Sequence, residues 1–205
     1  MVGELRRGDK VVIATHNEGK ARELAELFAP IGIKTVSAGA LGLFEPDETG
    51  ATFAENAKIK AGAASSVTGM LSVADDSGLE VTALGGAPGI HSARWGGPNK
   101  DFRLAMERVN RELEASGLAD RSARFVCALA LGQPRGETLV RIGKINGTIV
   151  WPPRGTRGFG YDPIFVPDGY AETFGEMDPV LKSAISHRMR AFEKLILSTW
   201  PYDED

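Results

Sequence analysis

Short apolar runs alternate with amphipathic stretches along the first third of the chain, an alternation that is typical of a mixed α/β fold. Residues 10–15 are a compact β-branched run that predicts a buried strand. Apolar residues then recur at helical spacing over 20–28 and stop before Pro30, which predicts a helix ending there. Residues 33–36 fit a second strand.

A second helix is predicted after an acidic loop at 45–50. Thr52 and Glu55 stand at the spacing of a capping box, in which each side chain accepts a hydrogen bond from the other residue's backbone N–H. Apolar and small residues follow at helical spacing. The helix is therefore expected to begin directly after Thr52.

The rest of the chain continues the same mixture of elements. It predicts a helix over 101–115, two long antiparallel strands over 123–131 and 137–145, a short strand over 163–167 and a final helix over 186–200. No internal repeat, low-complexity segment or linker separates them. We therefore expect a single domain over 1–205, with an α/β fold in which helices flank a mixed, elongated β-sheet.

The most informative motif is the pair of adjacent carboxylates Asp75 and Asp76. We expect a short buried strand over 71–74, a turn at 77–78 that ends it, and a further strand over 79–81. Neighbouring side chains of a strand point to opposite faces, so the two carboxylates are expected to have different roles. One of them suits a hard cation such as Mg²⁺ or proton transfer from water; the alternative is an Asx turn that binds backbone N–H groups.

The junction between the first strand and the first helix is a candidate anion site. Its residues are Thr15, His16, Asn17, Glu18, Gly19 and Lys20. A helix N-terminus presents unpaired N–H groups and the positive end of the helix dipole, which suits a phosphate, and Lys20 adds a full charge. The segment does not match the Walker pattern, and the alternative is an ordinary helix start with a solvated lysine.

Three acidic residues, Glu45, Asp47 and Glu48, crowd the loop before the second helix. Mg²⁺ commonly uses one or two carboxylates together with substrate phosphates and water. The loop is therefore a candidate source of a second carboxylate for a metal held by the aspartate pair. The alternative is a solvated acidic turn near a helix N-terminus.

A glycine-rich loop over 155–162 contains Phe159 and Tyr161 and ends in Asp162. Glycines let the backbone approach a ligand closely, and an aromatic ring offers a stacking face for a base. The alternative is a surface turn whose aromatic rings cover the core.

Three basic residues, Lys182, His187 and Arg188, surround Ser186, which is a good N-cap for the final helix. Basic donors at a helix start suit an anion or a carbonyl oxygen. The alternative is a normally capped helix with solvated cations.

Composition narrows the classes of function. The formal net charge of -3 and the pI near 5.7 argue against binding nucleic acid or an acidic membrane surface. No stretch approaches the ~18 apolar residues of a membrane span, and the N-terminus lacks the apolar core of a signal peptide, so a cytoplasmic protein is expected.

The single cysteine, Cys127, lies in an apolar run and is expected to be a small buried hydrophobe, and no Cys/His spacing suits structural zinc.

In their order along the chain, these motifs resemble the inosine/xanthosine triphosphate pyrophosphatases that clear aberrant purine nucleotides. The blocks that carry the resemblance are Thr15–Lys20, Glu48–Phe53, Ala74–Leu79, Gly85–Gly89, Ser92–Arg94, Gly158–Pro163 and Ser186–Arg188. The resemblance implies an elongated mixed α/β fold, a homodimer and dependence on Mg²⁺. It also implies hydrolysis of ITP, dITP or XTP to the monophosphate and pyrophosphate, which keeps these nucleotides out of DNA and RNA.

The resemblance further assigns roles to residues. Asp76 would be the catalytic carboxylate and a Mg²⁺ ligand, with Glu45 or Glu48 as a further ligand, and Ser77 would contact the substrate. The segment Thr15–Lys20 would bind the triphosphate. The base and sugar pocket would be formed by Phe159, Gly160, Tyr161 and Asp162, and the purine would be held by Lys182, His187 and Arg188.

The residues leave open how Asp75 and Asp76 divide their work, which of Glu45 and Glu48 meets the metal, and which triphosphate is preferred. A base that carries a keto oxygen at position 6 would accept hydrogen bonds from basic donors, whereas the amine of adenine would leave them unpaired.

Two other functions remain as alternatives. A related pyrophosphatase with a different base preference would keep the acidic and phosphate motifs, and the His187-Arg188 pair speaks against it. A nucleotide sensor without turnover would need to have lost a carboxylate or the phosphate lysine, yet the aspartate pair and Lys20 are present.

Overall fold

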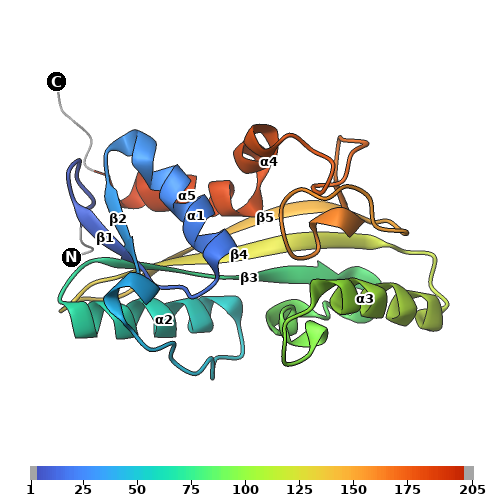
Figure 1. Ribbon diagram of the computed structural model, residues 1–205, viewed down its shortest axis with the longest axis horizontal. Coiled ribbons are helices and arrows are strands. Elements are labelled where there is room, and N and C mark those ends of the chain that lie inside the picture. The colour runs from blue at the N-terminus through green and yellow to red at the C-terminus, as the bar shows by residue number, and fades with distance from the viewer. Residues whose placement is uncertain (1–3, 201–205) are drawn as a thin grey trace. The chain divides into compact units, whose positions relative to one another are not determined.

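The computed structural model describes residues 4–200, which form a mixed α/β fold and thereby confirm the predicted fold class (Figure 1). Within these residues the strands join in one six-stranded sheet of order β2-β1-β3-β4-β5-β6. β1 pairs in parallel with β2 and β3, and β6 pairs antiparallel with β5. The strands are β1 (Lys10–Ile13), β2 (Lys34–Ser37), β3 (Ser72–Val81), β4 (Ser122–Gly132), β5 (Leu139–Ile149) and β6 (Phe165–Pro167).

Of the five α-helices within the described residues, four lie where the periodicity of the sequence predicts a helix. They are α1 (Glu18–Phe28), α2 (Phe53–Thr68), α3 (Phe102–Ser116), α4 (Pro179–Ile185) and α5 (His187–Thr199). The short α4 is the one that the sequence pattern does not predict. No helix between residues 4 and 200 has both the length and the apolar character of a membrane span.

The helix starts follow the local chemistry of the sequence. Thr52 Oγ1 accepts a hydrogen bond from the N–H of Glu55 at 3.2 Å, and a Glu55 carboxylate oxygen accepts one from the N–H of Thr52 at 3.1 Å. The predicted capping box is therefore confirmed. Asn17 caps α1 in a similar way, since its side chain accepts a hydrogen bond from the N–H of Lys20 at 3.0 Å.

The prediction that a turn at Ser77 and Gly78 ends a strand is wrong. β3 runs without interruption through this point to Val81 and carries the carboxylate pair in its interior. Leu79 and Val81 are fully buried in an apolar cluster, and this packing outweighs the turn preference of the Ser-Gly pair. The two carboxylates are therefore held by an extended strand.

The chain divides into two compact units. Unit 1 contains the residues up to Asp76, the stretch Cys127–Gly143 and the residues from Arg188 onward. Unit 2 contains Ser77–Val126 and Lys144–His187. Each unit has its own cluster of buried apolar side chains.

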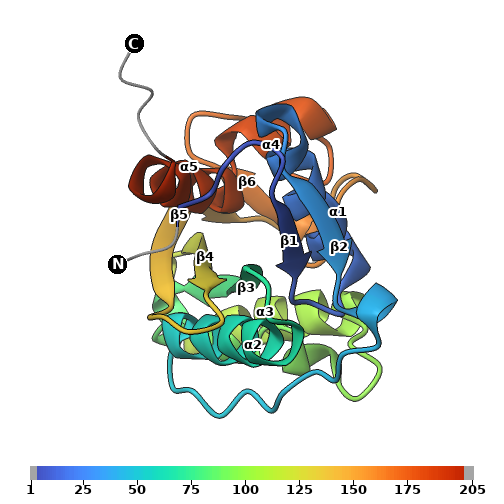
Figure 2. The same cartoon turned by 90° about the vertical axis from the view of Figure 1, so that its left-hand side faces the viewer.

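In unit 1, helices α1 and α5 pack on β1, β3 and β4. Phe28 of α1 and Phe192 of α5 meet edge to face, with ring centroids 5.0 Å apart. Helix α2 lies on the other side of these strands (Figures 1 and 2). Its backbone comes so close to β4 that a Cβ on Gly132 would lie 2.5 Å from the carbonyl oxygen of Ala61. The apolar face of α1 is packed against the strands of unit 1, including β3, which carries the aspartate pair.

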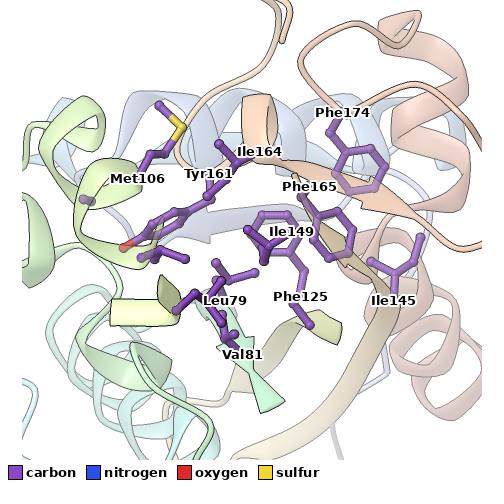
Figure 3. Close-up of a cluster of buried hydrophobic side chains, with 14 of the residues drawn as sticks. Leu79, Val81, Met106, Phe125, Ile145, Ile149, Tyr161, Ile164, Phe165 and Phe174 are labelled. Atoms are coloured by element: carbon purple, nitrogen blue, oxygen red, sulfur yellow. The ribbon is translucent and has the colours of Figure 1, made fainter. Parts of the chain in front are cut away.

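In unit 2, Phe125 of β4 and Phe165 of β6 pack together with ring centroids 4.6 Å apart, and Phe174 joins them (Figure 3). Met106 of α3 and Tyr161 belong to the same cluster. Tyr161 therefore anchors the end of the glycine-rich loop in the core of its unit.

Candidate functional site

Asp75 is completely buried in unit 1 and contacts two cations and a thiol. Lys20 Nζ lies 2.6 Å from its Oδ1, and Arg188 Nε and Nη2 each lie 3.1 Å from its Oδ2. Cys127 Sγ donates a hydrogen bond to Oδ2 at 3.0 Å. Burial alone would raise the pKa of this carboxyl, but the charges of Arg188 and Lys20 outweigh it and hold the pKa well below its usual value. Asp75 is therefore an ionised carboxylate at neutral pH.

Asp76, the next residue, meets a different set of partners, as the alternation along a strand predicts. Lys60 Nζ lies 3.0 Å from Asp76 Oδ1 and 2.8 Å from Glu48 Oε1, so one ammonium group joins both carboxylates. Burial raises the pKa of Asp76 above its usual value, and Glu48 adds to the rise, while Lys60 and Lys20 oppose it. A buried carboxyl with a raised pKa is typical of a general acid or base.

The donor set around Asp76 fits a divalent cation that brings further ligands with it. Asp76 Oδ2 is buried and has no hydrogen-bond partner among residues 4–200, and Glu48 contacts the same ammonium as Asp76. Within the described part of the chain, no three His, Cys, Asp or Glu side chains form a group suited to a metal. Two carboxylates are nevertheless enough for Mg²⁺, which commonly keeps water and phosphate oxygens as its other ligands.

Glu45 lines an apolar pocket of about 500 Å³ in unit 1. Its carboxylate lies 4.0 Å from Nδ1 of His16, and Nε2 of the same ring lies 2.8 Å from the carbonyl oxygen of Leu43. His16 thus contacts the segment that leads into the acidic loop. Of the two glutamates that the sequence leaves open, Glu48 is the one that shares an ammonium with Asp76.

The N-terminus of α1 is built as the sequence predicts. Thr15 Oγ1 accepts a hydrogen bond from the N–H of Asn17 at 3.2 Å, which fixes the chain just before the helix. His16, Asn17 and Glu18 are exposed. Lys20, in the first turn, reaches back to Asp75. The first turn of such a helix has N–H groups without intrahelical partners, which suits a phosphate.

In unit 2, Asp162 joins the glycine-rich loop to α4. Its Oδ2 accepts hydrogen bonds from the N–H of Phe159 and from Lys182 Nζ, both at 2.7 Å. The Lys182 ammonium lies 5.1 Å from the centroid of the Phe159 ring. Gly158 has a φ of 73°, and a Cβ there would lie 2.0 Å from the Asp162 carboxylate, so the turn requires glycine. The structure thus brings these predicted residues together.

Tyr161 and His187, also predicted pocket residues, are packed in the core of unit 2. The Tyr161 hydroxyl donates to the carbonyl oxygen of Ser92 at 2.7 Å, and burial raises its pKa. The His187 ring is buried and stacks on Phe125, with centroids 5.0 Å apart. Ser77 and Gly160 are half-buried.

Sequence reasoning misses two charged residues of the site, Lys60 and Glu23. Lys60 lies on the buried face of α2, among alanines. A lysine at such a position in the sequence could have indicated a buried charged group, because lysine is seldom buried without a partner. Glu23 forms an ion pair with Arg188, and nothing in its local sequence distinguishes it from Glu18 and Glu26, the exposed glutamates of the same helix. Cys127 is buried as predicted, but it also donates a hydrogen bond that its apolar neighbours do not reveal.

Comparison with known proteins gives consistent matches over most of the chain. A family model described as "Ham1 family" matches residues 11–197. A dITP/XTP pyrophosphatase of Caulobacter vibrioides is 57% identical over 188 residues, which are 92% of this chain and 96% of that protein. A dITP/XTP pyrophosphatase of Rhodospirillum centenum is 57% identical over 192 residues, 92% and 94% of the two chains. The structure of a HAM1 protein from Coxiella burnetii is 41% identical with a TM-score of 0.85, and the match covers 93% of this chain and 98% of the other.

Proposed function

The chain belongs to the Ham1 family, and from this premise we propose that it hydrolyses noncanonical purine nucleoside triphosphates such as ITP, dITP and XTP. The products are the monophosphate and pyrophosphate, so the enzyme is a nucleoside-triphosphate pyrophosphatase. The structural observation that carries the proposal is that the two neighbouring carboxylates on β3 differ in their partners and in the direction of their pKa shifts. Asp75 is ionised and held by cations, whereas Asp76 has a raised pKa and an oxygen without a hydrogen-bond partner among the described residues.

The triphosphate chain is assigned to unit 1. A polyphosphate is strongly anionic and repels an incoming nucleophile, so its site must supply positive charge. Lys20, Lys60 and the N-terminus of α1 supply that charge on the same unit that carries the aspartate pair.

Asp76 is the proposed general base. Its Oδ2 would accept a proton from water as the water oxygen attacks the α-phosphorus; the bond from this phosphorus to the oxygen bridging the β-phosphate then breaks, and pyrophosphate leaves. Mg²⁺ held by Asp76 and Glu48 would neutralise phosphate charge and make the water more acidic. Asp75 does not take the proton, because its low pKa makes it a poor base.

The family resemblance assigns the purine base to a second set of residues. Phe159 offers a stacking face, and Lys182 lies beside it. By the family resemblance, Lys182 and His187 would donate to the keto oxygen at position 6 of hypoxanthine and xanthine. Adenine carries an amine there and would leave a donor unpaired. A buried unpaired donor costs ~1–3 kcal/mol, which corresponds to about tenfold to hundredfold discrimination against ATP.

The family resemblance also supports a homodimer and a cytoplasmic location, where the triphosphate pool of the cell is used. Sedimentation equilibrium tests the first of these proposals. Twice the chain mass of 21.9 kDa is the expected result, and the mass of one chain would contradict it.

Pyrophosphate release from ITP, dITP, XTP, ATP, GTP and CTP, with Mg²⁺ and with EDTA, tests the proposed function. We expect metal-dependent release of pyrophosphate from ITP, dITP and XTP at rates well above those for ATP. Equal rates on all bases would favour a related pyrophosphatase with another specificity. Binding without turnover would favour a nucleotide sensor, and release of orthophosphate would contradict the proposed bond cleavage.

A further inference from the structure

Four charged side chains of unit 1 form a series of buried and partly buried ion pairs that begins and ends on α1. It starts at Lys20 in the first turn of α1 and passes to Asp75 on β3. From Asp75 it continues to Arg188 at the start of α5, and from Arg188 it returns to α1 at Glu23. Lys20 and Glu23 are three residues apart on one helix face, so the series begins and ends on the same turn of α1.

The charges in this series balance, and the two central members, Asp75 and Arg188, depend on their partners because they are buried. Two cations face two carboxylates, and the side chains of Asp75 and Arg188 are 0% and 3% exposed. Burial alone would lower the pKa of Arg188, but Asp75 and Glu23 outweigh it and raise the pKa above its usual value. Removing one partner from such a buried set leaves an uncompensated charge.

A neutral donor adds to the contacts of Asp75. Oδ2 accepts from Arg188 and from the Cys127 thiol, while Oδ1 accepts from Lys20. The thiol remains protonated, because burial and the neighbouring Asp75 raise its pKa well above the usual value. Cys127 therefore adds a donor without adding a charge, and it restricts the position of the carboxylate that holds Lys20.

We propose that Arg188 and Cys127 are positioning residues for the polyphosphate chain of the substrate. They act through Asp75 and Glu23, which fix Lys20 and the first turn of α1. This inference rests on the proposed function and gives Arg188 a different role from that of holding the purine. The two roles differ in a measurable way: a positioning residue for phosphate affects any polyphosphate, whereas a residue that binds the base affects only nucleotides.

Inorganic tripolyphosphate, which has no base, separates the two roles. The experiment measures its inhibition constant and the KM for ITP in the wild type, in Arg188→Met and in Arg22→Met, which removes an exposed cation from α1 as a control. We expect Arg188→Met to raise both constants together, by about tenfold for a lost charge-assisted interaction. A raised KM for ITP with an unchanged constant for tripolyphosphate would overturn the inference, as would a wild type that tripolyphosphate does not inhibit.

Milder variants keep the inference testable if Arg188→Met does not fold. Glu23→Gln keeps the shape of a partly exposed partner and is compared with Glu26→Gln, an exposed glutamate of the same helix. We expect Glu23→Gln to raise both constants by about threefold and the control to leave them unchanged. If Glu23→Gln and Glu26→Gln had the same inhibition constant for tripolyphosphate and the same KM for ITP, the inference would be contradicted.

The thiol is tested with a pair of substitutions of similar size. Cys127→Ser retains a donor and is expected to keep both constants near the wild-type values, whereas Cys127→Ala loses the donor and is expected to raise both. If Cys127→Ala changed only the unfolding midpoint, Cys127 would be structural and not positioning. A wild type that does not turn over ITP would instead contradict the proposed function.

Discussion

At the scale of single residues, Asp75 and Asp76 differ because of what surrounds each carboxylate. Both are buried, and burial by itself raises the pKa of an aspartate. Asp75 gains Arg188 and Lys20 as direct partners, and its pKa falls. Asp76 has Lys60 as its direct cation but shares it with Glu48, and its pKa rises. Two neighbouring and chemically identical side chains are thereby suited to different tasks.

Asp76→Asn should abolish turnover while the fold is kept. The amide cannot accept the proton of the attacking water, so we expect kcat to fall by about 10²-fold or more. Initial rates of pyrophosphate release and a thermal unfolding curve measure the two properties. Asp47→Asn, which changes an exposed carboxylate of the acidic loop, is the control. Wild-type kcat in Asp76→Asn would contradict the proposed mechanism.

At the scale of elements, the site depends on two helix starts and one strand. The Asn17 cap and the Thr52–Glu55 capping box define where α1 and α2 begin. β3, which lies between β1 and β4 in the sheet, carries the two aspartates. α2 also presents Lys60 from its buried stripe. The residue at which α2 begins therefore sets the position of Glu48, in the acidic loop before the helix, and of Lys60 within the helix.

Thr52→Ala should destabilise the protein by about 1 kcal/mol, because the N–H of Glu55 loses its side-chain acceptor at the N-terminus of α2. Urea unfolding monitored by circular dichroism measures the change. Thr52→Ser retains the hydroxyl and should stay close to the wild type. If alanine and serine gave the same midpoint, the capping hydrogen bond would have no energetic role.

At the scale of the whole molecule, each unit has its own apolar core, and unit 1 is assembled from three separate stretches of chain. The buried charge network draws on all three of these stretches, through Asp75, Cys127 and Arg188. Because these groups are paired only when the stretches have come together, their ionisation contributes to the stability of the folded state.

The stability of the chain should consequently depend on pH through Asp75. Its folded-state pKa lies below the unfolded value of about 3.9, so its contribution is fully present above that pH and is lost as the pH falls through the lowered folded pKa. We expect the free energy of unfolding of the wild type to exceed that of Asp75→Asn at neutral pH. The difference should shrink in acid. Urea titrations of both proteins between pH 7 and about pH 3 measure it, and a difference that is constant over this range would contradict the assignment.

The sequence alone determined the elements whose signals are local. Apolar periodicity and capping side chains specify α1, α2, α3 and α5, because their hydrogen bonds and buried faces involve residues a few positions apart. Local blocks of sequence were also enough to identify the family. The end of the strand at Ser77 was predicted wrongly, since the local Ser-Gly turn preference was weaker than the burial of Leu79 in a distant cluster.

Only the tertiary structure decided how the charges are shared. Arg188 meets Asp75 across 113 positions, Cys127 meets it across 52, and Lys60 joins Asp76 to Glu48. None of these partners is visible to a local pattern, because the energy of a buried ion depends on which opposite charges and donors the folded chain brings within a few ångströms of it. The sequence could thus place two carboxylates on opposite faces of a strand. The packing of strands and helices around them determined that Asp75 is held by two cations, whereas Asp76 keeps a buried oxygen without a hydrogen-bond partner among residues 4–200.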